Sequence, residues 1–311
     1  MINSPRKPLL LQFWDYIRKP TYPPLRAQPL RQTLSEVSQL FWFSLLVRLL
    51  LSIPLMWAVS AAGMDNQLTA AFEGMPVLLI LGLGALLIPV IEELWFRLFL
   101  RPSPINLVGA LLAIAYLVGV QLLPILSESS LAAALSGNNQ WVSPWGVLFL
   151  IVLGSFGLYL LVKRYYNPRH AEQFYSKNIA YLYYASSLLF GFIHVFNFAG
   201  IWQHFYLSPL IMLPYTVIGL VLGYIRIQHG FQWAVGLHAV NNAYAFLPFV
   251  IVYGLTGSTD MSDLSTATPT IESVVATLIV VVWGIGSLWM MIATCRRLWR
   301  DYRRYQLNRS R

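Results

Sequence analysis

Long apolar stretches recur along the chain, separated by polar, charged or proline-containing segments. A membrane-spanning helix needs about 20 predominantly apolar residues to cross the hydrocarbon core of a bilayer. Eight stretches qualify, so the pattern predicts an all-α, polytopic membrane protein with about eight transmembrane helices, near residues 41–62, 76–100, 105–126, 145–163, 179–199, 209–228, 231–256 and 273–295.

The overall composition supports this assignment. Of the 311 residues, 57% are hydrophobic and only 11% are charged, whereas soluble domains carry about 25% charged residues. The formal net charge of +9 would suggest nucleic acid as a partner if the protein were soluble. Because membrane topology explains the basic excess better, we expect the lipid bilayer as a partner and no nucleic acid.

The basic residues are distributed asymmetrically among the loops. Of the 21 Lys and Arg residues, 20 lie in the segments 1–40, 97–101, 163–178, 226–230 and 296–311. None lies in the alternate loops, near 63–75, 127–144, 200–208 and 257–272. Cytosolic loops are rich in Lys and Arg, so eight spans with both termini in the cytosol fit the pattern. Arg48, the remaining basic residue, lies one to two turns inside the first span, and we expect it to snorkel to the interface.

Basic segments flank the predicted membrane domain of residues 41–295. Residues 1–40 form a basic cytosolic segment, in which residues 9–18 could be a helix on the membrane surface or part of a loosely ordered tail. Residues 296–311 form a basic cytosolic tail. We expect no cleavable signal peptide, because the first long apolar run begins near Leu40. A single cysteine, Cys295, excludes an intrachain disulfide framework.

Charged side chains interrupt the second predicted span. Glu92, Glu93 and Arg97 lie within six residues, among leucines and aromatics. Each ionisable group in a membrane costs about 2.5–3.5 kcal/mol on insertion scales, which makes this stretch a candidate functional site. Residues four apart share a helix face, so Glu93 and Arg97 can form an ion pair. Glu92 points about 100° away, and it is the carboxylate that we expect to take part in chemistry.

The fifth predicted span also carries polar side chains. Phe190 is followed four residues later by His194, and Asn197 comes three residues after that. His194 is about 15 residues from the expected start of its span, deeper than the other candidates, so we expect this helix to begin above the bilayer. We interpret the histidines outside the candidate motifs as solvated or interfacial: His170, His204 and His229.

The seventh predicted span contributes a histidine and an amide. His238 and Asn242 are four residues apart and share a helix face. Asn241, three residues from His238, competes with Asn242 on spacing alone. A glutamate near an attacking water, with imidazole and amide donors where negative charge develops, suits peptide hydrolysis.

Two other interpretations of the same residues stay open. Glu92, His194 and His238 offer three N/O ligands, which would suit a metal-dependent hydrolase with an open coordination position. No His-Glu-x-x-His sequence is present, however. The polar cluster could also serve helix packing in a non-enzymatic immunity or scaffold protein.

Three motifs together resemble a known family. Glu-Glu-x-x-x-Arg at 92–97, Phe-x-x-x-His at 190–194 and His-x-x-x-Asn at 238–242 are similar to the motifs of the CPBP family, the CAAX-protease and bacteriocin-processing proteins also called the Abi family. Their order matches, as does their placing on separate membrane helices. The resemblance covers roughly residues 76–250. It implies a glutamate-dependent intramembrane endopeptidase. We expect no cofactor.

The resemblance also implies roles for individual residues. Glu92 would be the general base that activates a water, and His194 would help to hold and polarise it. His238 and Asn242 would donate hydrogen bonds to the oxyanion. The supporting residues would be Glu93, Arg97, Phe190, Asn197 and Asn241.

Members of this family act on different substrates. Eukaryotic members remove the last three residues of prenylated CAAX proteins, and bacterial members are linked to peptide maturation, bacteriocin immunity and sometimes scaffolding. We therefore expect a peptide or a membrane protein, lipidated or not, as substrate. We expect a multi-pass protein of the cell membrane, with a bacterial inner membrane preferred to the endoplasmic reticulum.

Overall fold

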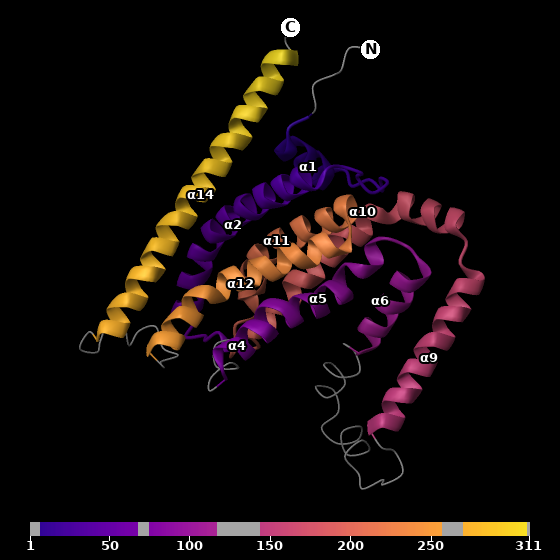
Figure 1. Cartoon of the computed structure of the whole chain (residues 1–311), viewed down its shortest axis with the longest axis horizontal. Helices are drawn as coiled ribbons and strands as arrows, with labels where there is room; N and C mark the ends of the chain where they lie inside the picture. The colour runs from indigo at the N-terminus through magenta and orange to yellow at the C-terminus, as the bar shows by residue number, and fades with distance from the viewer. Residues whose placement is uncertain (1–6, 68–74, 117–143, 257–269, 310–311) are drawn as a thin grey trace. The chain divides into compact units, whose positions relative to one another are not determined.

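The computed structural model describes residues 7–67, 75–116, 144–256 and 270–309 (Figure 1). All regular elements in these residues are helical, apart from one isolated bridge between Asn66 and Phe198. Six helices of the described chain are long and apolar enough to cross a membrane: Leu30–Ala61, Val77–Phe96, Pro168–Asn197, Phe205–His229, Phe231–Thr256 and Ile271–Asn308. The all-α, polytopic fold expected from the sequence is confirmed.

Of the two other expected spans, one falls partly outside the described residues. α6 (Pro104–Tyr116) is a shorter apolar helix at the start of the stretch expected to span 105–126, and the rest of that stretch lies outside the described residues. α9 (Pro144–Tyr165) is a 22-residue helix where the span 145–163 was expected. Both helices are consistent with a total of about eight.

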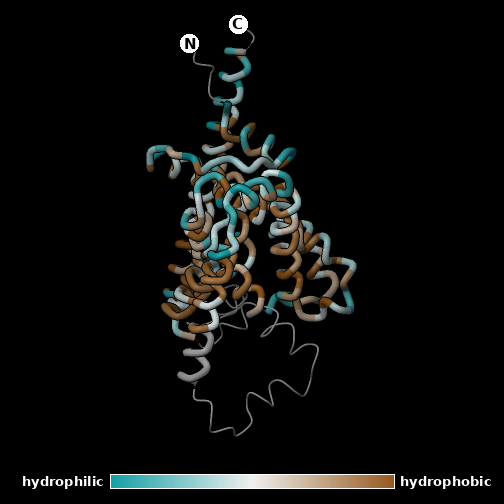
Figure 2. Tube along the Cα trace, turned by 90° about the vertical axis from the view of Figure 1, so that its right-hand side faces the viewer, coloured by the Kyte–Doolittle hydropathy of each residue, from teal (hydrophilic) through white to brown (hydrophobic). Residues whose placement is uncertain are grey.

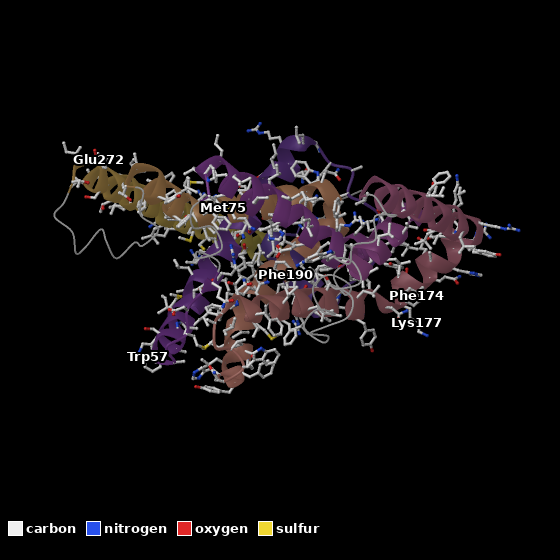
Figure 3. All side chains as sticks on the ribbon, turned by 90° about the horizontal axis from the view of Figure 1, so that it is seen from below. Trp57, Met75, Phe174, Lys177, Phe190 and Glu272 are labelled. Carbon is white, nitrogen blue, oxygen red and sulfur yellow. The ribbon has the colours of Figure 1, made fainter. Side chains whose placement is uncertain are left out.

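Large apolar side chains are exposed on the outside of the helices. Leu78 and Ile271 are 83% and 81% exposed, and Trp57 projects outward with 76% of its surface exposed (Figure 3). Hydrophobic residues run along the helices, whereas hydrophilic residues gather near the chain termini (Figure 2). Such extensive exposed apolar surface marks contact with another apolar phase. The protein is therefore a multi-pass membrane protein.

The chain forms two compact units. Unit 1 contains residues 1–90 and 180–311, and unit 2 contains residues 91–179. The division runs through two helices, α5 (Ile88–Phe96) and α10 (Pro168–Ile193). α10 begins at Pro168, well before residue 179; a start above the bilayer stays a prediction.

Four long helices form the body of unit 1. They are α2 (Leu30–Ala61), α11 (Ser208–His229), α12 (Phe231–Thr256) and α14 (Ile271–Arg309). α11 packs on α2 and α12, and α14 packs on the same two helices (Figure 1). The second half of α11 is almost wholly buried from Val221 to His229. This buried stretch includes polar side chains at its end, Arg226, Gln228 and His229.

Of the two alternatives for residues 9–18, a helix or a loosely ordered tail, the structure has a helix, α1 (Leu9–Arg18). Its apolar residues pack on the protein: the Tyr16 ring lies 5.2 Å from the rings of both Tyr183 and Tyr224, in edge-to-face contacts. α1 also packs on α14, toward its C-terminal half (Figure 1). The two basic ends of the chain therefore lie together in unit 1. Their cytosolic position and an interfacial location for α1 stay predictions.

α2 begins at Leu30, eleven residues before the expected span, and its first turns carry a buried polar cluster. The expectation of a solvated or interfacial His229 is wrong. Its side chain is 1% exposed, and Nε2 lies 3.4 Å from the carboxylate of Glu36. Arg26 lies 3.3 Å from the same carboxylate. Packing of the chain before α2 against the end of α11 buries this histidine, whereas His170 is exposed and His204 partly exposed.

The second expected span is a helix with a widened segment. α4 (Val77–Ile80) leads into the π-helix η1 (Leu81–Leu87), which continues as α5. The Ile88 N–H donates to the carbonyl of Leu83, five residues earlier, as in a π-helix. Pro89 follows, and a proline in a helix removes an N–H and crowds the carbonyl four residues before it. Widening the helix ahead of Pro89 relieves that crowding.

Candidate active site

His194 lies where α10 ends. The helix stops at Ile193, and residues His194–Asn197 form the 3₁₀ turn η4. The Nδ1 atom of His194 lies 2.7 Å from the carbonyl oxygen of Phe190. Because a carbonyl oxygen only accepts, Nδ1 carries the hydrogen, and Nε2 of the neutral ring is the acceptor. The turn thus presents His194 with a basic Nε2.

A close approach of α10 and α11 places an aromatic ring against this imidazole. A Cβ at Gly191 would overlap the hydroxyl of Thr216 and come within 3.0 Å of the Met212 carbonyl, so only glycine allows this spacing. On the same stretch of α11, the Tyr215 ring stacks on His194, with centroids 4.1 Å apart and planes inclined by 20°. The stacking limits the imidazole to one orientation.

Phe190 connects the two candidate histidines. It is 1% exposed, and its ring lies 4.6 Å from the ring of His194 and 5.5 Å from that of His238. His238 lies on α12 and is 2% exposed. The structure therefore brings the second and third sequence motifs together in unit 1. Asn197 lies at the end of the same turn as His194 and is partly exposed.

The two asparagines of α12 have different partners. The Asn242 side-chain N–H donates to the carbonyl of Gly84 in η1, at 3.1 Å. The Asn241 side-chain N–H donates to Oδ1 of Asn242, at 3.2 Å. Asn241 is 7% exposed, whereas Asn242 is more accessible. Accessibility favours Asn242 over Asn241 as the group that meets a ligand.

Arg48 is a residue of this region that the sequence analysis missed. The expectation that it snorkels to the interface is wrong: its Nη2 donates to Oδ1 of Asn241. Packing of α2 on α11 and α12 holds it there. The signal available in the sequence for this buried contact was an arginine more than one turn inside an apolar span.

The first motif lies in unit 2, at the end of α5. Glu93 and Arg97 are both fully buried, with Oε1 and Nη1 3.8 Å apart, so the ion pair expected from the i, i+4 spacing is present. Arg97 leaves the helix, and a 3₁₀ turn, η2 (Leu98–Leu100), follows. Glu92 is partly exposed, on another face of the same helix. Burial thus distinguishes the two neighbouring carboxylates.

Tyrosines fix the segment that follows Arg97. The hydroxyl of Tyr175, on α10, donates to the carbonyl of Phe99, and that of Tyr166 donates to the carbonyl of Pro102 at 3.2 Å. α6 packs on η2 and on α9 within the same unit. These contacts hold the end of α5 in place, so the direction of the Glu92 side chain is set by a rigid helix end.

The candidate residues of unit 1 and those of unit 2 carry complementary functional groups. Unit 1 holds an imidazole with an accepting nitrogen, a second buried imidazole and an amide donor, while unit 2 holds a partly exposed carboxylate beside a buried ion pair. These are the functions that acid–base hydrolysis uses. Carboxylate and imidazole are also ligands of catalytic zinc, but the described residues contain no group of three or more His, Cys, Asp or Glu placed to hold a metal ion.

Comparison with known proteins agrees with these motifs. The family model for type II CAAX prenyl endopeptidases of the Rce1-like kind matches residues 74–244, more than half of the chain. All three motifs lie in the matched segment. No curated protein and no solved structure matches the chain. The resemblance to the CPBP family is confirmed, and the chain belongs to the Rce1-like family of type II CAAX prenyl endopeptidases.

Proposed function

We propose that this protein is an intramembrane endopeptidase that cleaves a peptide bond near the cytosolic membrane face with a water activated by Glu92. Family membership supports a CAAX-type protease with a peptide substrate in a bilayer. We further propose that Glu92 and His194 act on one water molecule and that His238 and Asn242 stabilise the oxyanion. A bacterial inner membrane is the proposed location.

Each proposed role follows from an observed side-chain environment. Glu93 is paired with Arg97 and fully buried, which leaves Glu92 as the accessible carboxylate of the motif. His194 is held by two contacts, the hydrogen bond to Phe190 and the stack on Tyr215, so its accepting Nε2 has a defined direction. A fixed acceptor beside a water contributes about 10²–10⁴-fold to the rate through general base catalysis.

The observation that carries the proposal is the packing of both imidazoles on Phe190. This packing brings His194, on the turn after α10, and His238, on α12, to the same buried ring. Asn242 lies one turn beyond His238 on α12, and an amide can donate to an oxyanion without adding charge. Removing one such donor costs about 10²–10³-fold in kcat.

The direct test is cleavage of a farnesylated C-terminal peptide by the purified protein in nanodiscs. Glu92→Ala, His194→Ala and His238→Ala should each abolish cleavage while the folded protein remains in the membrane. Glu272→Gln, at an exposed acidic residue that begins α14, serves as the matched control and should cleave like the wild type. Full activity of Glu92→Gln would contradict the proposed mechanism.

Comparative peptidomics would identify the natural substrate and cleavage site. Membranes of cells that carry the wild type should contain shortened peptides that are absent with Glu92→Ala. A phenotype that survives alanine at Glu92 and His238, at normal expression, would indicate a scaffold or immunity role. Loss of cleavage on exhaustive chelation, with recovery on adding zinc, would indicate the metal-dependent hydrolase.

The side of the membrane has its own test. In a Cys295→Ser background, single cysteines at positions 92, 194 and 238 should react with a membrane-impermeant thiol reagent only when it is applied from the cytosolic side. Labelling from the outside alone would contradict the proposed cytosolic opening.

A further inference from the structure

We infer that Arg48 and Asn241 are positioning residues that hold the Asn242 amide with its N–H groups toward the reaction site. This inference rests on the proposed function, because it explains how Asn242 can act as an oxyanion donor. The observation is a chain of three hydrogen bonds in unit 1 that joins α2, α12 and η1: Arg48 to Asn241, Asn241 to Asn242, and Asn242 to the carbonyl of Gly84.

One end of this chain is a group that can only donate. The guanidinium of Arg48 has five N–H donors and no acceptor. Its Nη2 therefore requires an oxygen from Asn241, and the Asn241 amide must turn Oδ1 toward α2. The Nδ2 group of Asn241 then faces Asn242, which must present Oδ1 in return.

The other end is a group that can only accept. In the π-helical register the carbonyl of Gly84 would bond the N–H of residue 89, but residue 89 is proline and has no N–H. The Ile88 N–H is already used by Leu83. The Gly84 carbonyl is satisfied instead by Nδ2 of Asn242, at 3.1 Å. Because Pro89 has no N–H, the Gly84 carbonyl lacks that backbone donor, and the Asn242 amide donates to it instead.

The two ends together determine the direction of both amides. Turning either asparagine over would place two N–H groups against each other at one of its two contacts and two oxygens against each other at the other. A side-chain amide has two N–H donors, and Gly84 takes one from Asn242. The second N–H stays on the same side of Asn242 for a developing oxyanion. Asn241 is buried, and both its side-chain oxygen and its side-chain N–H group make hydrogen bonds, so it acts only through Asn242.

The sharpest test compares two substitutions of Asn241. Asn241→Asp keeps the shape and still accepts from Arg48, but its carboxylate attracts the N–H groups of Asn242 and turns that amide over. Asn241→Ala removes the contact without offering a competing acceptor. We expect kcat of Asn241→Asp to approach that of Asn242→Ala, about 10²–10³-fold below wild type, and to fall at least about 10-fold below that of Asn241→Ala, with KM little changed.

A purely structural role predicts the opposite order. If Asn241 only filled space, the isosteric aspartate would be milder than the alanine. Equal or higher activity of Asn241→Asp relative to Asn241→Ala, at comparable melting temperature, would therefore overturn the inference.

Substitutions of Arg48 test the other end of the chain. Arg48→Lys keeps a pure donor and should restore most of the activity that Arg48→Met loses, which we expect to be about 10-fold in kcat. Arg297→Met, at an exposed arginine of α14, is the matched control and should not change the rate. Equal losses for lysine and methionine at position 48 would contradict the inference.

A spectroscopic measurement separates this inference from the proposed function. In protein labelled with ¹⁵N-asparagine, the side-chain NH₂ signals of Asn242 are those missing from Asn242→Ser. Arg48→Met should shift them, and Arg297→Met should not. If the wild type does not cleave the farnesylated peptide but the shift is seen, the function fails and the positioning stands; unshifted signals refute the positioning whatever the activity.

Discussion

Two polar groups in this protein are built in different ways. In unit 2, Glu93 and Arg97 lie one turn apart on α5, and both are fully buried. In unit 1, the chain from Arg48 to the Gly84 carbonyl joins three segments, and its first two members are 193 positions apart in the sequence. The first group is stabilised by opposite charges, and the second contains one charge and two neutral amides.

The difference shows what each group requires from the fold. An i, i+4 pair needs only that a helix forms, because helix geometry alone brings the two side chains together. The longer chain needs three helices in register, and each amide must face one way. We therefore expect the local pair to control stability most strongly and the long-range group to control alignment. Four substitutions test this contrast, from the largest expected effect to the smallest.

Arg97→Met should have the largest effect on stability. It leaves Glu93 as a buried carboxylate without its cation, and breaking such a pair costs about 3–5 kcal/mol in the free energy of unfolding. Thermal unfolding in detergent would measure the loss. The double variant Glu93→Gln/Arg97→Met should recover most of it, and Glu92→Gln, one position away and partly exposed, should unfold near the wild-type temperature. An unchanged melting temperature for Arg97→Met would show that the pair is not structural.

Gly84→Ala should have the next largest effect, through overpacking in the long-range group. Its Cβ would lie 2.7 Å from the Phe246 ring, one turn after Asn242 on α12. Overpacking costs about 1–3 kcal/mol, and the ring must move away from η1. Gly82→Ala is the matched control in the same π-helix, since its Cβ would meet nothing within 4 Å.

Relief by a second substitution completes that test. Phe246→Leu removes ring atoms that the alanine meets, so Gly84→Ala/Phe246→Leu should unfold at a higher temperature than Gly84→Ala. If Gly82→Ala lowers the unfolding temperature as much as Gly84→Ala, the loss comes from a change in η1 itself and not from the contact with α12.

Glu36→Gln should have a smaller effect. Its carboxylate accepts from Arg26 at 3.3 Å and lies 3.4 Å from His229, but the Arg26 side chain is 24% exposed and the distances are long. Hydrogen bonds of this kind are worth about 1 kcal/mol. A double-mutant cycle with Arg26→Gln would measure the coupling between the two side chains. Strict additivity of the two substitutions would show that the contact contributes nothing.

Asp15→Asn should have the smallest effect. It breaks the ion pair between Lys7 and Asp15, whose side chains are 42% and 48% exposed. Exposed pairs contribute at most about 0.5 kcal/mol and are screened by salt. Melting temperatures at low and high salt should agree within error for both proteins. A loss as large as that of Glu36→Gln would indicate that α1 contributes more to unit 1 than its buried face.

Much of the fold was predictable from the sequence because apolar length and helix spacing act locally. The six described spans coincide with expected stretches, and the Glu93–Arg97 pair follows from four-residue spacing. Three short motifs were enough to indicate the family. The contact of Phe190 with both histidines, in contrast, depends on how α10 and α12 pack, which no single stretch encodes.

Arg48 and His229 show where the sequence was insufficient. His229 ends α11, whereas Arg48 lies near the middle of α2. At neither position can periodicity distinguish a snorkelling or solvated side chain from one covered by a distant segment. The sequence determined the helices, the buried ion pair and the candidate residues, since these depend on neighbours within a few turns. Only the tertiary structure decided that Arg48 donates to the Asn241 amide and that Asn242 donates to the Gly84 carbonyl, which Pro89 cannot bond. These contacts exist only once helices far apart in the chain have packed.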